Sequence, residues 1–301
     1  MAFIEHRHLG TDGPSVPVLG FGAWPIGGGL GRVEKSTALA TVRAAIDSGI
    51  TLVDTAEGYR TSEALIGEAL RAGYRDRCFL ATKASRDFRP RGIRRALEAS
   101  LRALRVDHVD LYQIHGWDAA VPVEQSMEEM ARLKEEGKTR FVGVSNFLPQ
   151  HMERARSVCP VVANQVRYSL LFREIEEGTV DYCRRHGIGI LVHSPLAKGL
   201  LTGRYTPNST FAADDERSGF ADFTGERFAR HLARADRLAE IAREKQLTLV
   251  QLAIAWTLRL DVVSCTLVGA KSPEQISDHG KAAGVTLSAA DLERIEKALA
   301  G

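Results

Sequence analysis

Several polar residues, three of which can ionise, stand at the ends of apolar segments in this sequence. They are Asp54, Lys83, His115, Ser145, Asn146 and Gln165, each following a short run rich in β-branched residues. A carboxylate such as Asp54 is costly to bury without a partner, which an ammonium group such as Lys83 could supply. Singly, these residues have simpler explanations: a helix cap, a solvated lysine or a hydrogen-bonded core histidine. Their recurrence at the ends of consecutive segments favours one shared site for proton chemistry.

The apolar segments alternate with segments of helical periodicity, in which Leu97, Leu101 and Leu104, for example, share a face. Strands are expected at 18–22, 50–54, 78–83, 109–115, 140–145, 161–165, 189–194 and 264–269. Strands alternating with helices predict parallel βαβ units, and eight units fit an α/β fold, the (β/α)8 TIM barrel. We expect residues 1–301 to form a single domain, with Ser36 preceding the first helix. The polar strand ends would then meet at the barrel's C-terminal mouth.

Two stretches depart from this alternation. A turn at 11–14 predicts a short N-terminal β-hairpin at the bottom of the barrel. Residues 199–226 are much longer than an ordinary barrel loop, and such loops are usually functional or disordered. Within them, Phe220 and Phe223 could equally form a lid or pack on the surface. The glycine-rich run 27–31 matches neither the dinucleotide fingerprint nor the P-loop, so we expect a flexible loop at the barrel mouth.

Composition excludes several classes of protein. Of the 301 residues, 44% are hydrophobic and 26% charged, which indicates a globular protein with a large core. The formal net charge of +2 is spread along the chain, so we expect neither a nucleic-acid nor a membrane partner. The four scattered cysteines and nine histidines show no metal-binding spacing and suit a cytoplasmic protein with reduced thiols. We predict no metal, no signal peptide and no membrane span.

Motifs along most of the chain resemble those of the aldo-keto reductases. They are VDTAEGY (53–59), TK (82–83), DLYQIH (110–115), GVSNF (143–147), NQVRYSLL (164–171), SPLAKGLLTGRY (194–205) and GAKSPEQ (269–275). They occur in the order that the family shows, and together they are highly specific. The resemblance implies a TIM barrel, an NAD(P)H-dependent carbonyl reduction and a catalytic tetrad at Asp54, Tyr59, Lys83 and His115.

The chemistry of that reaction explains the four residue types. Hydride delivery to a carbonyl carbon leaves an alkoxide that needs a proton, which Tyr59 could donate. A Lys83 ammonium about 4 Å away would stabilise the phenolate by roughly 4 kcal/mol and lower the phenol pKa by up to roughly 3 units. Asp54 would keep Lys83 charged and oriented, while a neutral His115 could donate a hydrogen bond to the carbonyl oxygen.

The resemblance also implies the cofactor contacts. Ser145, Asn146 and Gln165 match the clasp on the nicotinamide carboxamide, and Gly199 and Leu201 would offer backbone amides to the pyrophosphate, with Arg204 as a charge partner. Lys271 and Gln275 match the contacts to the adenosine 2′-phosphate, which favours NADPH. The predicted cofactor-binding set is Gly22, Ala23, Ser145, Asn146, Gln165, His193, Ser194, Pro195, Leu196, Gly199, Leu201, Arg204, Gly269, Lys271, Gln275, Asp278 and His279.

This sequence departs from the family pattern at three places. His193 stands where an aromatic residue often stacks on the nicotinamide, and it offers less stacking area. Gly116 and Trp117 replace a common Trp-Pro pair after the catalytic histidine. His279 replaces an asparagine on the adenine side. The predicted walls of the substrate pocket are Trp24, Trp117 and Phe147.

The leading hypothesis is an NADPH-dependent reductase of aldehydes or ketones that also runs in reverse as an alcohol dehydrogenase. One alternative is a nucleotide-sensing regulatory protein on the same fold, which the intact tetrad disfavours. Another is a sugar-oxidising dehydrogenase of the family. The sequence leaves the physiological substrate and the oligomeric state open, although a monomer is plausible.

Overall fold

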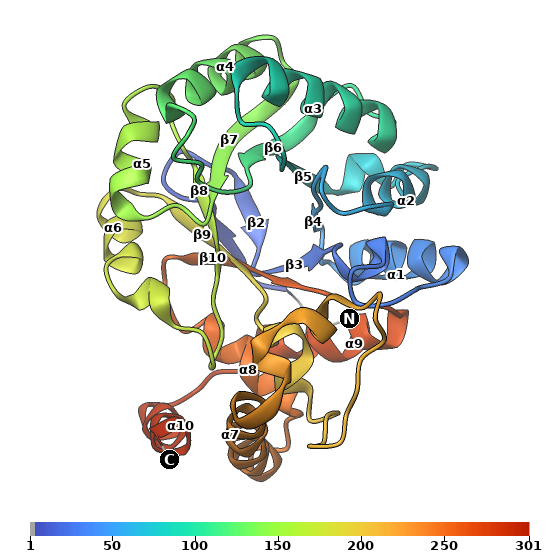
Figure 1. Ribbon diagram of the computed structural model, residues 1–301, viewed down its shortest axis with the longest axis vertical. Helices are drawn as coiled ribbons and strands as arrows, with labels where there is room; N and C mark the ends of the chain where they lie inside the picture. The colour runs from blue at the N-terminus through green and yellow to red at the C-terminus, as the bar shows by residue number, and fades with distance from the viewer. Residues whose placement is uncertain (1–3, 301) are drawn as a thin grey trace.

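The computed structural model describes residues 4–300, whose central feature is a closed barrel of eight parallel strands (Figure 1). Neighbouring strands follow the chain order from β3 to β10, and β10 closes the barrel against β3. The strands are β3 (Leu19–Gly22), β4 (Leu52–Asp54), β5 (Phe79–Ala84), β6 (Val109–Ile114), β7 (Thr139–Ser145), β8 (Ala163–Arg167), β9 (Gly189–His193) and β10 (Val263–Val268). Each lies on one of the eight predicted segments, so the predicted TIM barrel is confirmed.

The helices form an outer ring around the barrel (Figure 1). They are α1 (Lys35–Asp47), α2 (Ser62–Ala69), α3 (Pro90–Leu104), α4 (Val123–Glu135), α5 (Pro149–Arg156), α6 (Thr179–Arg185), α7 (Gly225–Glu244), α8 (Leu249–Thr257), α9 (Pro273–Gly280) and α10 (Ala289–Ala300). Helix α10 lies beside α7, and both add to the eight helices that follow the barrel strands. Helix α7 has an apolar face whose side chains, such as Phe228, Leu232 and Leu238, are buried in the main hydrophobic core.

A β-hairpin closes the bottom of the barrel, as predicted. Strand β1 (His6–His8) pairs antiparallel with β2 (Ser15–Pro17), and the connecting residue Leu9 is fully buried. Leu9 and Val16 pack among the inward-facing residues Leu52, Leu111 and Leu191, so they fill the end of the barrel opposite the mouth. Burial of such side chains supplies much of the stability of this end of the fold.

The alternation of side chains along the strands creates a polar layer above this apolar plug. Residues two apart on a strand share a face, so the residue two positions after each inward-facing apolar residue lies one layer nearer the mouth. The apolar layer of Leu52, Ala81, Leu111, Ala163 and Leu191 is therefore followed by Asp54, Lys83, Gln113, Gln165 and His193. The sequence pattern thus directs all five polar side chains into the barrel mouth.

Helix starts differ from the sequence-based expectation. Helix α1 begins at Lys35, so Ser36 lies inside its first turn and does not precede it. In α2, Thr61 occupies the N-cap position without a side-chain hydrogen bond. The hydroxyl of Ser62 lies 2.9 Å from Thr55 Oγ1 and donates to the carbonyl oxygen of Ala23 at 3.3 Å, because it faces the barrel. Tertiary partners thus take the Ser62 hydroxyl out of capping, and Thr61 makes no capping bond.

Candidate active site

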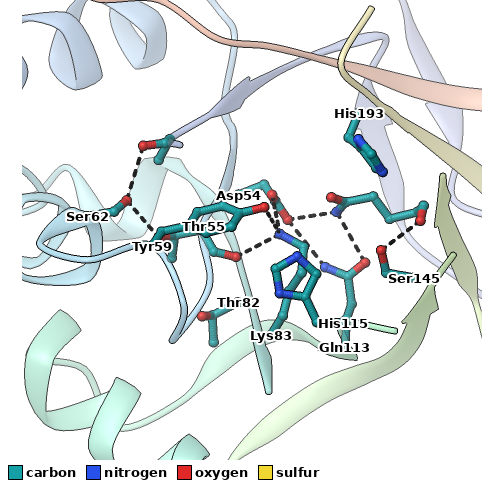
Figure 2. Close-up of polar contacts among 12 residues, drawn as sticks. Asp54, Thr55, Tyr59, Ser62, Thr82, Lys83, Gln113, His115, Ser145 and His193 are labelled. Atoms are coloured by element: carbon teal, nitrogen blue, oxygen red, sulfur yellow. Dashed lines mark hydrogen bonds and ion pairs between the residues drawn. The ribbon is translucent and has the colours of Figure 1, made fainter. Parts of the chain in front are cut away.

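The predicted tetrad meets at the mouth of the barrel around Lys83 (Figure 2). Lys83 Nζ donates to Asp54 Oδ2 at 2.6 Å, to the carbonyl oxygen of Thr55 at 2.9 Å and to the hydroxyl oxygen of Tyr59 at 3.3 Å. Its side chain is fully buried. The three acceptors match the three hydrogens of the ammonium group, so none of these hydrogens needs water as a partner. The arrangement fixes the ammonium group directly beside the phenol.

Asp54 is held by amides as well as by the ammonium group. Its Oδ1 accepts from Gln165 Nε2 at 2.9 Å and from Gln113 Nε2 at 3.3 Å, while Oδ2 accepts from Lys83. These bonds lock the carboxylate in the layer of polar side chains and leave it no part in capping α2. Sequence reasoning missed Gln113, although its place two residues after Leu111 puts it in the same layer as Asp54.

A tight turn returns Tyr59 over the barrel mouth. The Tyr59 amide donates to the carbonyl oxygen of Ala56 at 2.9 Å, and the ring packs edge-on against Trp24 and His115, at centroid distances of 4.8 and 5.5 Å. Burial raises the pKa of the Tyr59 phenol, and the nearby Lys83 ammonium opposes this effect without overcoming it. The expectation of a lowered phenol pKa is therefore wrong, because the loss of hydration on burial outweighs the attraction of the Lys83 charge.

Lys83 remains an ammonium group in this environment. Burial by itself would lower the pKa of Lys83, but the Asp54 carboxylate and the Tyr59 phenol raise it above its usual value. A buried cation is costly unless it is paired and fully hydrogen-bonded. The three acceptors described above meet that condition, so Lys83 carries a fixed positive charge beneath Tyr59.

His115 is neutral, and a serine hydroxyl contacts its Nδ1 atom. Burial, together with the charge of Lys83, lowers the pKa of His115 to about 3. Ser85 Oγ lies 2.7 Å from His115 Nδ1, so a Ser85 hydroxyl that donates there leaves the proton on Nε2. Ser85 lines the large cavity described below. It had not been singled out in the sequence, because a lone serine after a strand carries no distinctive signal.

His193 makes polar contacts through both ring nitrogens. Its Nε2 lies 3.1 Å from Asn146 Oδ1 and its Nδ1 lies 3.0 Å from Ser194 Oγ. Because Asn146 Nδ2 donates to Ser145 Oγ and to the carbonyl oxygen of His115, Asn146 Oδ1 is the acceptor for His193 Nε2–H. Burial lowers the pKa of His193 to about 3, so the ring stays neutral. An aromatic hydrocarbon ring at this position could not make these bonds.

A cavity of about 980 Å³ opens above the tetrad. Most of the predicted residues line it: Gly22, Trp24, Asp54, Tyr59, His115, Gln165, His193, Ser194, Pro195, Leu196, Gly199, Arg204, Gly269, Lys271, Gln275, Asp278 and His279. Other predicted residues lie outside this lining: Ala23, Lys83, Ser145, Asn146, Leu201, Trp117 and Phe147. Lys83 and Ser145 are fully buried beneath the cavity.

The two aromatic residues placed outside the lining pack on each other instead. Phe147 is buried and meets Trp117 edge-on, with ring centroids 5.6 Å apart. The indole of Trp117 stacks in parallel on His151 at 3.8 Å and lies beneath the Arg154 guanidinium. The structure therefore brings Trp24 to the cavity, but it commits Trp117 and Phe147 to a separate aromatic stack.

The predicted amide donors for a pyrophosphate are engaged elsewhere. The amides of Gly199 and Leu201 both donate to the carbonyl oxygen of Leu196, at 2.9 and 3.2 Å. These bonds lie in the kinked segment η4 (Ala197–Thr202), whose backbone is non-helical at Lys198, Gly199 and Leu201 and in which Leu201 is fully buried. The expectation that these two amides face the pyrophosphate is thus not met. Gly199 still lines the cavity, and its φ of 104° is a conformation that favours glycine.

Cationic side chains gather at the end of the cavity that lies away from Tyr59. Lys271 Nζ donates to the carbonyl oxygen of Leu30, and burial, reinforced by the charge of Arg217, lowers the pKa of Lys271. Arg217 is paired with Asp215 at 2.5 Å, and Arg204 lines the same cavity. The buried Nδ1 atom of His279 has no hydrogen-bond partner among residues 4–300. This end therefore offers charge and an unsatisfied ring nitrogen to a bound anion or base.

The long segment after β9 reaches across to the loop that follows β3. Trp24 Nε1 donates to Glu216 Oε1 at 2.8 Å, Lys198 Nζ lies 2.5 Å from the same oxygen, and the amide of Glu216 donates to the carbonyl oxygen of Gly29 at 3.3 Å. The expected flexible glycine-rich loop is thus tied to residues 215–217. Within the long segment Phe223 is buried, while Phe220 is partly exposed beneath the Lys198 ammonium. Sequence reasoning did not identify Glu216 or Arg217.

Two further properties concern the whole described chain. Among residues 4–300, no group of three or more His, Cys, Asp or Glu side chains is arranged to hold a metal ion. None of the helices within that range combines the length and the apolar character needed to cross a membrane.

A closed parallel barrel, with an acid–base cluster below a large cavity at its C-terminal mouth, defines a TIM-barrel enzyme. A sequence model of the Aldo/keto reductase family matches residues 18–300. The chain is 35% identical to aldo-keto reductase YhdN of Bacillus subtilis (strain 168), over 98% of this chain and 94% of that one, and 32% identical to probable aldo-keto reductase 1 of Glycine max, over 99% and 90%. The protein belongs to the aldo/keto reductase family.

A solved structure supports the same assignment. The glycerol dehydrogenase AKR11B4 from Gluconobacter oxydans superposes with a TM-score of 0.89 and 33% sequence identity, covering 100% of this chain and 96% of that one. The chain is therefore an NAD(P)-dependent oxidoreductase acting on a small molecule, which confirms the family and the enzyme class predicted from the motifs.

Proposed function

We propose that the protein is an NADPH-dependent reductase of aldehydes and ketones, reversible with the corresponding alcohols, in which Tyr59 is the general acid. The observation that carries this proposal is the fully buried Lys83 ammonium, which lies 2.6 Å from Asp54 and 3.3 Å from the Tyr59 hydroxyl at the floor of the large cavity. A protonated phenol beside a fixed cation is suited to donating a proton to an oxygen that becomes negative.

The cavity lining fits a nicotinamide dinucleotide. His193 and Gln165 in the lining, with Asn146 hydrogen-bonded to His193 beside it, offer the polar groups that would hold the nicotinamide end, and Arg204, Arg217 and Lys271 offer positive charge for phosphates. The orphaned Nδ1 of His279 supplies a ring nitrogen that would donate to or accept from an adenine base, according to the tautomer of the ring. When bound, the cofactor supplies the hydride that reduces the carbonyl carbon.

The side chains at the cavity floor manage the proton and the developing charge. Because burial raises the pKa of Tyr59, the phenol is protonated at neutral pH and ready to donate. Lys83 lies close enough to stabilise the phenolate that forms, and Asp54 keeps Lys83 in place. A neutral His115 with its proton on Nε2 would donate a hydrogen bond to the substrate oxygen and orient it toward Tyr59.

A preference for NADPH over NADH follows from the cations at the far end of the cavity. The 2′-phosphate is the group that distinguishes the two cofactors, and charge-assisted hydrogen bonds from Lys271 would favour it. Arg217, which sequence reasoning missed, lies near enough to Lys271 to lower its pKa. Two cations so close together would be stabilised by a shared anion.

The oxidative alternative also has an observation in its favour. A structural relative with 33% identity is a glycerol dehydrogenase, which would make a polyol the substrate and oxidation the working direction. Oxidation needs Tyr59 as a phenolate to accept a proton, and burial disfavours that form at neutral pH. We therefore propose carbonyl reduction as the direction favoured near neutrality.

The test is a panel of aldehydes, ketones and polyols assayed with both NADPH and NADH, in the wild type and in Tyr59→Phe. Reduction of activated aldehydes with NADPH, nearly abolished in Tyr59→Phe, is the expected result. Wild-type-like turnover in Tyr59→Phe would overturn the role of Tyr59. Tight cofactor binding without turnover of any compound would instead support the nucleotide-sensing alternative.

A further inference from the structure

A second cavity, of about 390 Å³, lies beside the first one, between the end of β8 and the start of α7. Four arginines line it, Arg167, Arg227, Arg230 and Arg234, together with only two carboxylates, Glu174 and Asp222. Positive charge in a concave site focuses the electric field and attracts anions. Because four guanidinium groups face only two carboxylates, the lining of this cavity carries a net positive charge.

The carboxylates neutralise these arginines only in part. Arg167 pairs with Glu174 at 3.0 Å, whereas Arg227 lies 3.7 Å from Asp222. Arg230 pairs at 3.7 Å with Glu226, a surface residue on the same helix, and such exposed pairs contribute little. Asp222 is shared with the ring of His231, whose Nε2 lies 3.2 Å from its Oδ1.

Arg234 differs from the other three arginines of the cavity because no ion pair within residues 4–300 includes it. Its side chain is half-buried, yet no carboxylate of residues 4–300 lies within ion-pair distance of it. Arg227, Arg230 and Arg234 recur at spacings of three and four residues on α7, so they share one face of the helix. A half-buried guanidinium without a counter-ion has five hydrogen-bond donors available to a ligand.

Arg167 connects this cavity to the proposed catalytic cavity. It follows Gln165 by two residues on β8, so its side chain leaves the strand on the same face, one layer nearer the mouth. Arg167 pairs in register with His193 of β9 and lines both cavities. Its guanidinium lies over the ring of Phe172 at 4.2 Å, which fixes its position at the junction.

We propose that this cavity, bounded by Arg167, Arg230 and Arg234, binds a phosphate or carboxylate group carried by the carbonyl substrate. The proposal rests on the proposed function, because the reacting carbonyl lies at Tyr59 while the anionic end reaches the arginines past Arg167. Planar guanidinium groups bind carboxylates and phosphates in a bidentate manner, so they select for charge and for geometry. The preferred substrates are therefore anionic aldehydes or ketones.

The kinetic test compares 4-carboxybenzaldehyde with its neutral methyl ester. The ratio of kcat/KM for the acid to that for the ester should fall about tenfold or more in Arg234→Gln and in Arg230→Gln, because a hydrogen bond to a charged group is lost. Arg243→Gln is the matched control: it removes an exposed arginine from the same helix, outside the cavity. An unchanged ratio in Arg234→Gln and Arg230→Gln overturns the proposal.

A calorimetric titration with inorganic phosphate separates this site from the proposed function. Cofactor-bound protein should bind phosphate in the wild type and in Arg243→Gln, and lose that binding in Arg234→Gln. Phosphate that competes with 4-carboxybenzaldehyde but not with the ester identifies the site as part of the substrate pocket. Phosphate that alters turnover of both aldehydes identifies a free anion as the ligand, and overturns the substrate assignment. Failure of both aldehydes to react would count against the proposed function alone.

Discussion

The ammonium group of Lys83 lies 3.3 Å from the hydroxyl oxygen of Tyr59 at the mouth of the barrel, where Lys83 is fully buried and Tyr59 is partly buried. This contact couples two opposing effects. Burial disfavours the phenolate, while the adjacent charge favours it, and the first effect is larger. Tyr59 is thereby kept as a proton donor, with a cation already in place for the charge that donation leaves behind.

The contact predicts separate consequences for catalysis and for stability when Lys83 is replaced. Lys83→Met should lower kcat by about a hundred- to a thousandfold, because one electrostatic stabiliser of a transition state is worth that order. It should also lower the free energy of unfolding by about 3–5 kcal/mol, since Asp54 is left as an unpaired buried charge. Steady-state kinetics and urea denaturation measure the two effects.

The double variant Lys83→Met with Asp54→Asn distinguishes the two effects. Removing the orphaned charge should recover most of the lost unfolding free energy, while kcat stays at the level of Lys83→Met. Recovery of activity in the double variant would show that Lys83 acts through stability and not through Tyr59.

The pKa shifts predict an unusual pH profile. Because the pKa of Tyr59 is raised, the donor form persists through neutral pH, and the rate of carbonyl reduction should decline only in strongly alkaline solution. Alcohol oxidation, which needs the phenolate, should rise steadily over the same range. His115, with a pKa of about 3, should add no acidic limb above about pH 5. Initial rates in both directions against pH test this, and a reduction limb that titrates near neutrality would contradict it.

The strands and the inward-facing places of Asp54 and Lys83 could be predicted because they follow from a period of two, whereas Tyr59, which lies on the loop after β4, was assigned through the resemblance to the family. Leu52 and Asp54 share a face, as do Leu111 and Gln113, so an apolar residue followed two positions later by a polar one marks the barrel interior near the mouth. The same period, applied consistently, would have found Gln113. Its contact with Asp54 joins residues 59 positions apart, yet it follows from strand alternation alone.

Contacts between loops could not be predicted in this way. The hydrogen bond from Trp24 to Glu216 joins residues 192 positions apart, and neither loop has a periodic pattern that specifies its partner. The engaged amides of Gly199 and Leu201 likewise depend on a local turn that sequence spacing does not define. The pKa of Tyr59 was mispredicted because burial, unlike the charge of Lys83, cannot be read from neighbouring residues.

Ser85 is predicted to be a positioning residue that acts through His115. Its hydroxyl lies 2.7 Å from His115 Nδ1, so Ser85→Ala removes the group that holds the proton on Nε2. We expect kcat to fall about tenfold, the worth of one hydrogen bond of ordinary strength. Nitrogen NMR of the imidazole should show the Nε2–H tautomer in the wild type and a mixture in Ser85→Ala. An unchanged tautomer together with an unchanged kcat would remove Ser85 from the mechanism.

Lys271 is predicted to set the choice of cofactor. Lys271→Gln should weaken NADPH binding by about 10- to 100-fold and leave NADH binding nearly unchanged, because only the 2′-phosphate loses a charge-assisted contact. Fluorescence titration with each cofactor measures both constants. Lys281→Gln, which removes a lysine of the same region from outside the cavity, is the matched control. An equal loss of affinity for NADH and NADPH would show that Lys271 only shapes the loop.

Glu63 is predicted to limit the stability of the protein at neutral and alkaline pH. Its carboxyl is buried on α2, where it accepts a hydrogen bond from Thr82 Oγ1 at 2.7 Å, and burial raises its pKa. A carboxyl whose pKa is higher in the folded state favours folding below its unfolded pKa and loses that contribution as the pH rises through the folded value. Glu63→Gln keeps the shape but removes the ionisation, so it should unfold at higher urea concentration than the wild type at alkaline pH.

The difference between Glu63→Gln and the wild type should shrink toward zero as the pH falls below about 4.5, where Glu63 is protonated in both states. Glu68→Gln provides the control, since that carboxylate lies on the same helix and forms a surface ion pair with Lys35. It should show no gain at alkaline pH. Urea denaturation across the pH range measures these differences, and a gain for Glu63→Gln that is constant with pH would mean that ionisation of Glu63 is not the cause.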